Sequence, residues 1–512
     1  MEGDSRTING IRNSSITLIL NIFSIIIQFF SRKIFINYLG TEVMGLNTTI
    51  VSILQFLNIA ELGVGQAISF TLYKPLYEKS NNIVIEIISL QGWIYKRIAI
   101  VVIICSSLVM IFFPVFFSKT VLPLWYSYAT FGVLLSSVIL SYIYNYDSVI
   151  LTADQKDYKI QICNRLPYII KNVSQIILLP LFCNGYVVWL VLEVLFSLII
   201  AISLKKSVKN SYPYLKSIHC SKEIRNKYSS IVIKIKQIFF HKIGAFALTQ
   251  TSPLIIYGFT TLTTVALYGN YMVVINGIGL LLKSVFNSIT AGVGNLVAEG
   301  DKQRIFAVFR ELFTFRFFCV SIASICFYYL INPFISIWLG REYVFENEIV
   351  FIIALVFFVD NLRSVVDTYI NAYGMFWDVW SPVAEAFINI SMSILLGCFL
   401  GLSGILVGTL LSLLLVIHIW KPFFLFQYGL HLSIFTYISL LLKHLLCLVS
   451  TIVSFELFNS IVNGLNNSTI SGFIIYMLVV VLFNGIVLYT MLLLLENSMR
   501  RFTRRILLLI TK

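Results

Sequence analysis

The chain has 512 residues, of which 58% are hydrophobic and 12% are charged, and its formal net charge is +14. Soluble domains carry about 25% charged residues, so this composition excludes a soluble globular protein and predicts an all-α integral membrane protein. Its basic residues are spread over many loops beside apolar stretches, as at membrane surfaces. We therefore expect no nucleic-acid partner.

About fourteen apolar stretches follow one another, each close to the roughly 20 residues that span a bilayer. The first stretch has no small-residue cleavage site after it, so it is interpreted as a retained span. The predicted spans are 13–36, 46–71, 97–117, 126–151, 161–182, 185–204, 239–261, 265–290, 316–338, 349–372, 382–400, 403–420, 435–457 and 470–495.

The loops between these spans differ in charge. Lys and Arg gather in alternate loops, such as 205–227 and 302–310, and in the tail 500–505, whereas the opposite loops offer mainly Lys119 and Arg341. The positive-inside rule places the basic loops in the cytoplasm. We therefore expect a multi-pass protein of the bacterial inner membrane with both termini cytoplasmic.

The longest cytoplasmic connection divides the chain. We predict an N-lobe of six spans at 1–204, a linker at 205–238, a C-lobe of six spans at 239–420, and two appended spans with a basic tail at 421–512.

Within the linker, apolar residues recur at helical spacing, which predicts an amphipathic helix along the inner leaflet. The alternative is a solvated connector. The apolar residues are Ile224, Tyr228, Ile231, Val232 and Ile235.

A short glycine pattern occurs in both lobes. Gly63-Val64-Gly65 lies in the second span and Gly292-Val293-Gly294 in the eighth. The corresponding positions predict a parallel repeat about an axis along the membrane normal. Close packing of helices would explain the same glycines without a repeat.

Three segments near the N-terminus resemble the opening of Wzx-type polysaccharide flippases. They are Tyr38–Leu46 (YLGTEVMGL), Glu61–Gly65 (ELGVG) and Tyr73–Tyr77 (YKPLY), and the later Trp338-Leu339-Gly340 is also similar. These flippases share a superfamily with multidrug and toxin extruders (MATE) and the lipid II flippase. The resemblance implies a MATE-like bundle of two lobes with a V-shaped central cavity that works by alternating access.

The resemblance also implies the substrate, an oligosaccharide on a polyprenyl diphosphate that is moved to the outer leaflet for surface polysaccharide such as O-antigen, capsule or lipopolysaccharide. A polysaccharide polymerase and glycosyltransferases would be the partners. No cofactor is expected, although a gradient of protons or sodium ions is a candidate driving force.

Three alternatives stay open. Fourteen spans, against twelve common in Wzx-type flippases, leave the lipid II flippase possible. A membrane polymerase or ligase would be an enzyme with a sizeable outer loop, whereas the largest outer loop here, 333–348, is short. A drug or ion exporter is disfavoured because the first span is basic and has no carboxylate.

Arg12 lies at the inner end of that first span, and Gln28, Arg32 and Lys33 lie within it. The planar fork of Arg and the point charge of Lys both suit a diphosphate, so we expect the first three of these residues to contact the substrate. The alternative is that Arg32 and Lys33 reach lipid headgroups at the interface.

The eighth span places Lys283 among apolar residues, where a cation is costly unless it has a function or a partner. We predict that it faces the cavity and attracts the diphosphate; the alternative is an ion pair with Glu61. Asn58 and Gln250, on the second and seventh spans, are candidates for hydrogen bonds to sugars.

The tenth span contains Asp360, Arg363 and Asp367. Spacings of three and four residues put these side chains on one helix face, which favours a structural ion pair between helices, with a substrate or proton relay as the alternative. Glu385 is a further isolated acidic residue. No motif for a metal or a catalytic nucleophile is found.

Overall fold

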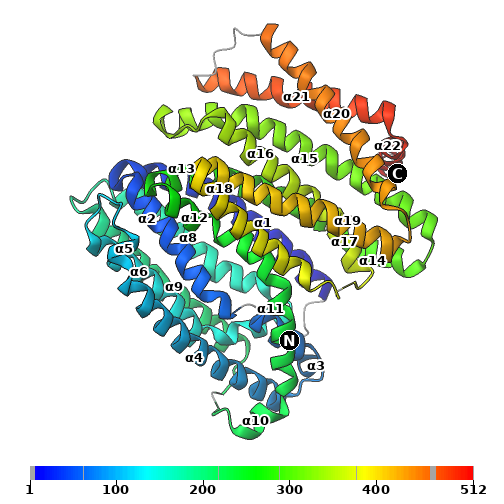
Figure 1. The fold of residues 1–512 in the computed structure, drawn as a ribbon. Helices are drawn as coiled ribbons and strands as arrows, with labels where there is room; N and C mark the ends of the chain where they lie inside the picture. The colour runs from blue at the N-terminus through cyan, green and yellow to red at the C-terminus, as the bar shows by residue number, and fades with distance from the viewer. Residues whose placement is uncertain are drawn as a thin grey trace. The chain divides into compact units, whose positions relative to one another are not determined.

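The computed structural model describes residues 6–510 except 62, 217, 288, 376 and 462–468. Its described residues are mostly helical and include no strand. The chain divides into two compact units, Met1–Ala266 and Leu267–Lys512 (Figure 1). The predicted all-α class is confirmed.

Ten helical segments among the described residues are long and apolar enough to cross a membrane. The protein is therefore a multi-pass membrane protein. The number fourteen stays a prediction, because some expected spans are broken and one candidate, Trp380–Leu430, is 51 residues long. Within it Gly401 has φ 56° and ψ −131°, a conformation open essentially to glycine, so the chain changes direction there.

Unit 1 consists of helices that pack side by side. α1 packs against α8, α8 against α9, α9 against α6, and α4 against both α3 and α6. Its elements are α1 (Arg6–Leu39), α2 (Thr41–Leu57), η1 (Asn58–Glu61), α3 (Val64–Tyr77), α4 (Asn81–Ile111), α5 (Phe113–Phe116), α6 (Leu124–Tyr144), η2 (Tyr146–Ser148), α7 (Val149–Ala153), α8 (Asp157–Leu178), α9 (Gly185–Ser211), α10 (Lys222–Lys227), α11 (Ser229–Gln250) and α12 (Ser252–Phe259). The division between the units falls within α13 (Leu262–Asn287).

The linker forms α10 and the start of α11, and its apolar side packs against unit 1. Ile231 is fully buried, and Ile224, Tyr228 and Ile235 pack against the same apolar cluster as residues of α3 and α4. Val232 alone of the predicted face is exposed. The helical spacing was interpreted correctly, but protein side chains and not leaflet lipid cover most of this face.

An ion pair also holds the linker to α4. Lys227 Nζ lies 2.6 Å from a carboxylate oxygen of Glu86, and the Tyr228 hydroxyl donates to the same oxygen at 2.7 Å. The hydrogen bond to Glu86 raises the pKa of Lys227. The linker therefore belongs structurally to unit 1.

Unit 2 is built around α15, which packs against α16, α20, α21 and α22, while α16 packs against α18. Phe309, Phe313 and Phe317 of α15 are fully buried. The elements after α13 are α14 (Thr290–Glu299), α15 (Lys302–Trp338), η3 (Arg341–Tyr343), α16 (Asn347–Leu362), α17 (Ser364–Ala372), α18 (Trp380–Ser412), the π-helix η4 (Leu413–Trp420), α19 (Lys421–Phe424), the π-helix η5 (Leu425–Leu430), α20 (Ile434–Ile461), α21 (Ile470–Leu495) and α22 (Asn497–Ile510).

Candidate functional site

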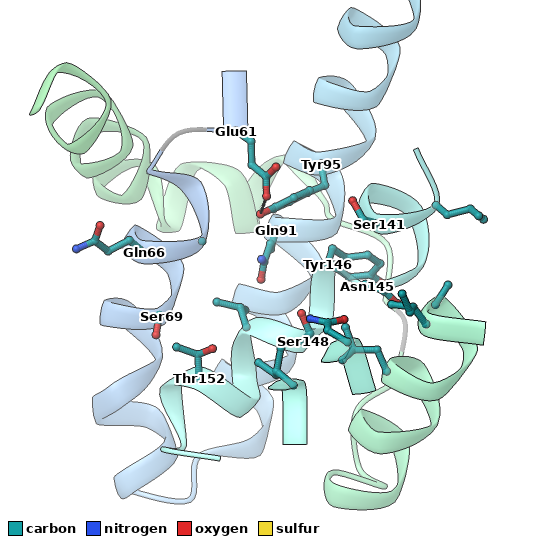
Figure 2. Close-up of a pocket in the computed structure, with 18 of the residues that line it drawn as sticks. Glu61, Gln66, Ser69, Gln91, Tyr95, Ser141, Asn145, Tyr146, Ser148 and Thr152 are labelled. Atoms are coloured by element: carbon teal, nitrogen blue, oxygen red, sulfur yellow. Dashed lines mark hydrogen bonds between the residues drawn. The ribbon is translucent and has the colours of Figure 1, made fainter. Parts of the chain in front are cut away.

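A cavity of about 720 Å³ lies within unit 1, at the ends of the helices that border the predicted cytoplasmic loops (Figure 2). Fourteen of its 22 lining residues carry polar side chains, and the lining includes no Lys or Arg. The polar lining residues are Glu61, Gln66, Ser69, Tyr73, Gln91, Tyr95, Ser137, Ser141, Asn145, Tyr146, Ser148, Thr152, Asn164 and Ser197.

Several helices each present one face to this cavity, because residues four apart lie on the same side of a helix. α4 contributes Gln91 and Tyr95, and α6 contributes Ser137 and Ser141. Small side chains at several of these positions leave the space unfilled. At Gly65 of α3, an added Cβ would approach nothing nearer than the Tyr95 hydroxyl at 3.8 Å, so the wall has room there.

Glu61 supplies the acidic group of the cavity. It ends η1, and Gly63 follows with φ +88°, a left-handed conformation that favours glycine. This break between α2 and α3 brings the carboxylate to the cavity wall. The Tyr95 hydroxyl donates to Glu61 Oε1 at 2.9 Å (Figure 2). Among the described residues of unit 1, no Lys or Arg forms an ion pair with Glu61.

Three further lining groups are buried acceptors without a hydrogen-bond partner among the described residues. They are Ser69 Oγ, Gln91 Oε1 and Asn145 Oδ1. Most buried polar groups in proteins are hydrogen-bonded, and leaving one unpaired costs about 1–3 kcal/mol. A cluster of unpaired acceptors beside a carboxylate is suited to a ligand rich in donors, such as hydroxyl groups.

The structure distributes the sequence-predicted residues of the first, second and seventh spans around unit 1, and of these only Glu61 lines the cavity. Arg32 of α1 is half-buried, and its Nη2 donates to the backbone oxygen of Ala266 at 3.3 Å. Gln28 is also half-buried on α1. The side chain of Arg12 lies outside the described residues.

Asn58 and Gln250 are both half-buried. Asn58 lies in η1, three residues before Glu61, and its Oδ1 is buried without a partner among the described residues. Gln250 ends α11 and has a partner.

In unit 2, Lys283 lies on α13 with an exposed side chain. Its predicted contact with a diphosphate stays a prediction.

The three charges of the tenth span come together in unit 2 as their spacing predicts. Arg363 lies 3.6 Å from Asp360 and 2.9 Å from Asp367, and a third carboxylate, that of Glu385 on α18, lies 3.5 Å away. Glu385 is almost fully buried. Arg363 lies between the end of α16 and the start of α17. This group, the Arg363 cluster, joins the junction of α16 and α17 to α18.

Sequence reasoning missed most of the cavity. The sequence pattern that could have revealed the cavity is polar residues four apart inside otherwise apolar stretches, such as Gln91 with Tyr95.

Sequence reasoning also missed a buried arginine of unit 2. Arg316 is 1% exposed on α15, and it donates through Nε to the backbone oxygen of Asn361 at 2.9 Å. The Arg316 guanidinium also lies over the Phe286 ring at 4.4 Å.

Solved structures with a similar fold include a lipid flippase and multidrug transporters. No model of a protein family and no curated protein matches the sequence. A structure of the lipid II flippase MurJ in an inward closed conformation matches with a TM-score of 0.58 at 13% identity, covering 93% of this chain and 97% of that one. This chain therefore shares the overall fold of that flippase.

Two MATE transporters support the same assignment of the fold. An inward-facing multidrug resistance MATE family transporter of the MOP superfamily matches with a TM-score of 0.54 at 12% identity, over 80% of this chain and 97% of that one. The Vibrio cholerae MATE transporter VcmN in the bent form matches with a TM-score of 0.51 at 12% identity, over 83% and 98%.

Proposed function

We propose that this protein flips a lipid-linked oligosaccharide from the inner to the outer leaflet of the cytoplasmic membrane by alternating access. The observation that carries the proposal is the cavity of unit 1, where hydroxyls, amides and one carboxylate surround a space of about 720 Å³. Sugar hydroxyls donate hydrogen bonds, and the unpaired acceptors of this cavity lack donors. Pockets for drug-sized ligands are mostly apolar, so this lining favours a glycan over an apolar drug.

In this proposal the diphosphate is bound by other residues, because no cation lines the cavity. Arg32 and Lys283 are the candidates, since each is a cation placed within a long apolar helix. Glycosyltransferases would supply the substrate and a polymerase would consume it in surface polysaccharide assembly. A proton or sodium gradient is the proposed driving force.

A lipid II flippase is the second candidate, and the extent of the MurJ match favours it. The 7% of this chain that the match does not cover is about 36 residues. The helices α20 and α21, with 28 and 26 residues, have 54 residues together. The match therefore includes at least part of the two appended helices.

Reconstitution into vesicles tests both candidates. The substrates are a fluorescent polyprenyl-diphosphate oligosaccharide, fluorescent lipid II and a cationic dye, and flipping is measured as the fraction that an external quencher reaches with time. We expect transport of the oligosaccharide lipid, accelerated by a gradient of one of the two ions. Transport of lipid II alone would favour the second candidate, and transport of the dye alone would overturn both.

The charge reversal Lys283→Glu tests the diphosphate site. A hydrogen bond to a charged group contributes about 1.5–3 kcal/mol, so we expect flipping to fall at least about tenfold and lipid-linked intermediates to accumulate. Lys33→Glu is the control, because Lys33 is an exposed cation of another long apolar helix, α1, to which the proposal gives no role. Equal flipping by Lys283→Glu and the unmodified protein would remove Lys283 from the site.

A further inference from the structure

The C-terminal helix α22 begins where a membrane-spanning helix ends. α21 ends at Leu495, Glu496 has an extended backbone with φ −124° and ψ 113°, and α22 starts at Asn497 (Figure 1, dark red, beside the C label). α21 is long and apolar enough to cross the bilayer. α22 therefore starts at the membrane boundary, on the side where the positive-inside rule predicts the cytoplasm.

One side of α22 packs against the other helices of unit 2. Met499 is 2% exposed. The ring of Phe502 stacks on Phe315 of α15 with centroids 4.4 Å apart. The Thr503 hydroxyl lies 3.0 Å from the hydroxyl of Tyr489 on α21. The helix is a docked element and not a free tail.

Buried polar contacts fix the same junction. Arg310 of α15 donates to Glu496 at 2.9 Å, and Glu496 is 1% exposed. The hydroxyls of Ser498 and Thr314 lie 2.9 Å apart, and both are fully buried. These contacts set the orientation of α22 on α15, and therefore the direction in which its other side points.

That other side carries four exposed arginines, Arg500, Arg501, Arg504 and Arg505, which we call the arginine face. Their spacing of one, three and one residues places them on one side of a helix. Arg500 donates to the backbone oxygens of α21, and Arg505 lies 3.2 Å from a carboxylate oxygen of Glu311. Arg501 and Arg504 form no ion pair with any described residue.

We propose that the arginine face binds the headgroups of anionic phospholipids in the leaflet at which α21 ends. Anionic leaflets attract basic segments next to a span, and a guanidinium can donate two parallel hydrogen bonds to a phosphate. The arginine face occupies one stretch of α22, residues 500–505, which is about 9 Å of helix, so it can contact one or two neighbouring headgroups. A phospholipid is favoured over a soluble partner because the face lies directly after a span.

This inference does not depend on the transported substrate. The helix is already docked on unit 2, so little conformational entropy is lost when the headgroups bind. Arg501 and Arg504 carry most of the binding, because Arg500 and Arg505 already have partners within unit 2.

Lipid binding to the full-length protein tests the proposal. Short-chain phosphatidylglycerol is titrated into the purified protein in an uncharged detergent, and bound lipid is counted by native mass spectrometry, with phosphatidylcholine and inorganic phosphate as comparison ligands. The double variant Arg501→Gln/Arg504→Gln should bind phosphatidylglycerol roughly tenfold or more weakly, at about a factor of five for each arginine near an anionic surface.

A matched control removes two exposed basic residues, Lys119 and Arg341, from loops that the positive-inside rule places on the opposite side of the membrane. Lys119→Gln/Arg341→Gln should change the affinity less than twofold, and Arg501→Lys/Arg504→Lys should retain most of it. Equal affinity of the double arginine variant and the unmodified protein would overturn the proposal. Displacement of phosphatidylglycerol by equimolar inorganic phosphate would also overturn it, because the face would then be a small-anion site.

Discussion

Two polar regions of this membrane protein differ in how their buried groups are satisfied. In the cavity of unit 1, Glu61 accepts a hydrogen bond from the Tyr95 hydroxyl, and three other lining groups have no partner among the described residues. In the Arg363 cluster of unit 2, one guanidinium is shared by three carboxylates. The first region leaves hydrogen-bonding capacity free, and the second uses it within the protein.

This difference separates a candidate ligand site from a structural one. Unpaired buried groups reduce stability, and sites that retain them do so in exchange for function. A buried ion pair is costly to break, because the charge that remains is neither paired nor solvated by water. Mutations in the cavity should therefore mainly reduce transport, whereas mutations in the Arg363 cluster should mainly reduce stability.

The largest expected effect is on stability, from Arg363→Met. The substitution leaves Glu385 buried without its cation, and such a loss costs about 3–5 kcal/mol. The melting temperature in detergent should drop, and the yield of folded protein should fall with it. Arg341→Met is the control, since Arg341 is exposed in η3 and an exposed substitution changes stability by about 0.5 kcal/mol or less. Equal melting temperatures of the two variants would contradict a structural role for the cluster.

The next effect is on transport, from Glu61→Gln. The amide keeps the shape of the side chain and an oxygen that can accept from Tyr95, so the free energy of unfolding should change by less than about 1 kcal/mol. Donors on a glycan lose a charged acceptor, and flipping should fall about tenfold. Measuring the flipping rate and the melting temperature on the same preparation separates the two effects. A large drop in stability with unchanged specific activity would place Glu61 with the structural groups.

What the sequence could predict is local along the chain. The all-α class followed from the length of the apolar stretches, and the shared face of Asp360, Arg363 and Asp367 followed from spacings within one helix. Glu385 could be named as an isolated charge, but its pairing with Arg363 depends on how α16 packs against α18. That packing is not encoded in any short segment.

The cavity could not be predicted from the sequence for the same reason. Gln91 with Tyr95 and Ser137 with Ser141 are ordinary pairs within single helices, and only the packing of α3, α4, α6, α8 and α9 brings such faces together. The linker shows the converse case. The helical spacing around Ile231 was correctly identified, but spacing cannot tell whether lipid or protein covers an apolar face.

The smallest expected effect is a change in stability whose sign distinguishes an unpaired glutamine from a hydrogen-bonded one. Gln91 is 1% exposed and its Oε1 has no partner among the described residues. Met has a similar shape and no strong hydrogen-bonding group, so Gln91→Met should raise the free energy of unfolding by about 1 kcal/mol. Flipping should fall a fewfold, because one acceptor for the glycan is lost.

The same substitution at a satisfied glutamine of unit 1 should have the opposite sign. Gln175 is also buried, but it donates to Glu193 at 3.1 Å and accepts from Ser31 at 3.3 Å. Gln175→Met removes both bonds and should lower the free energy of unfolding by about 1 kcal/mol or more. Chemical unfolding of the two variants in the same detergent measures the contrast. If both variants were destabilised alike, Gln91 would be a paired structural residue, and the cavity would lose one of the free acceptors that favour a glycan.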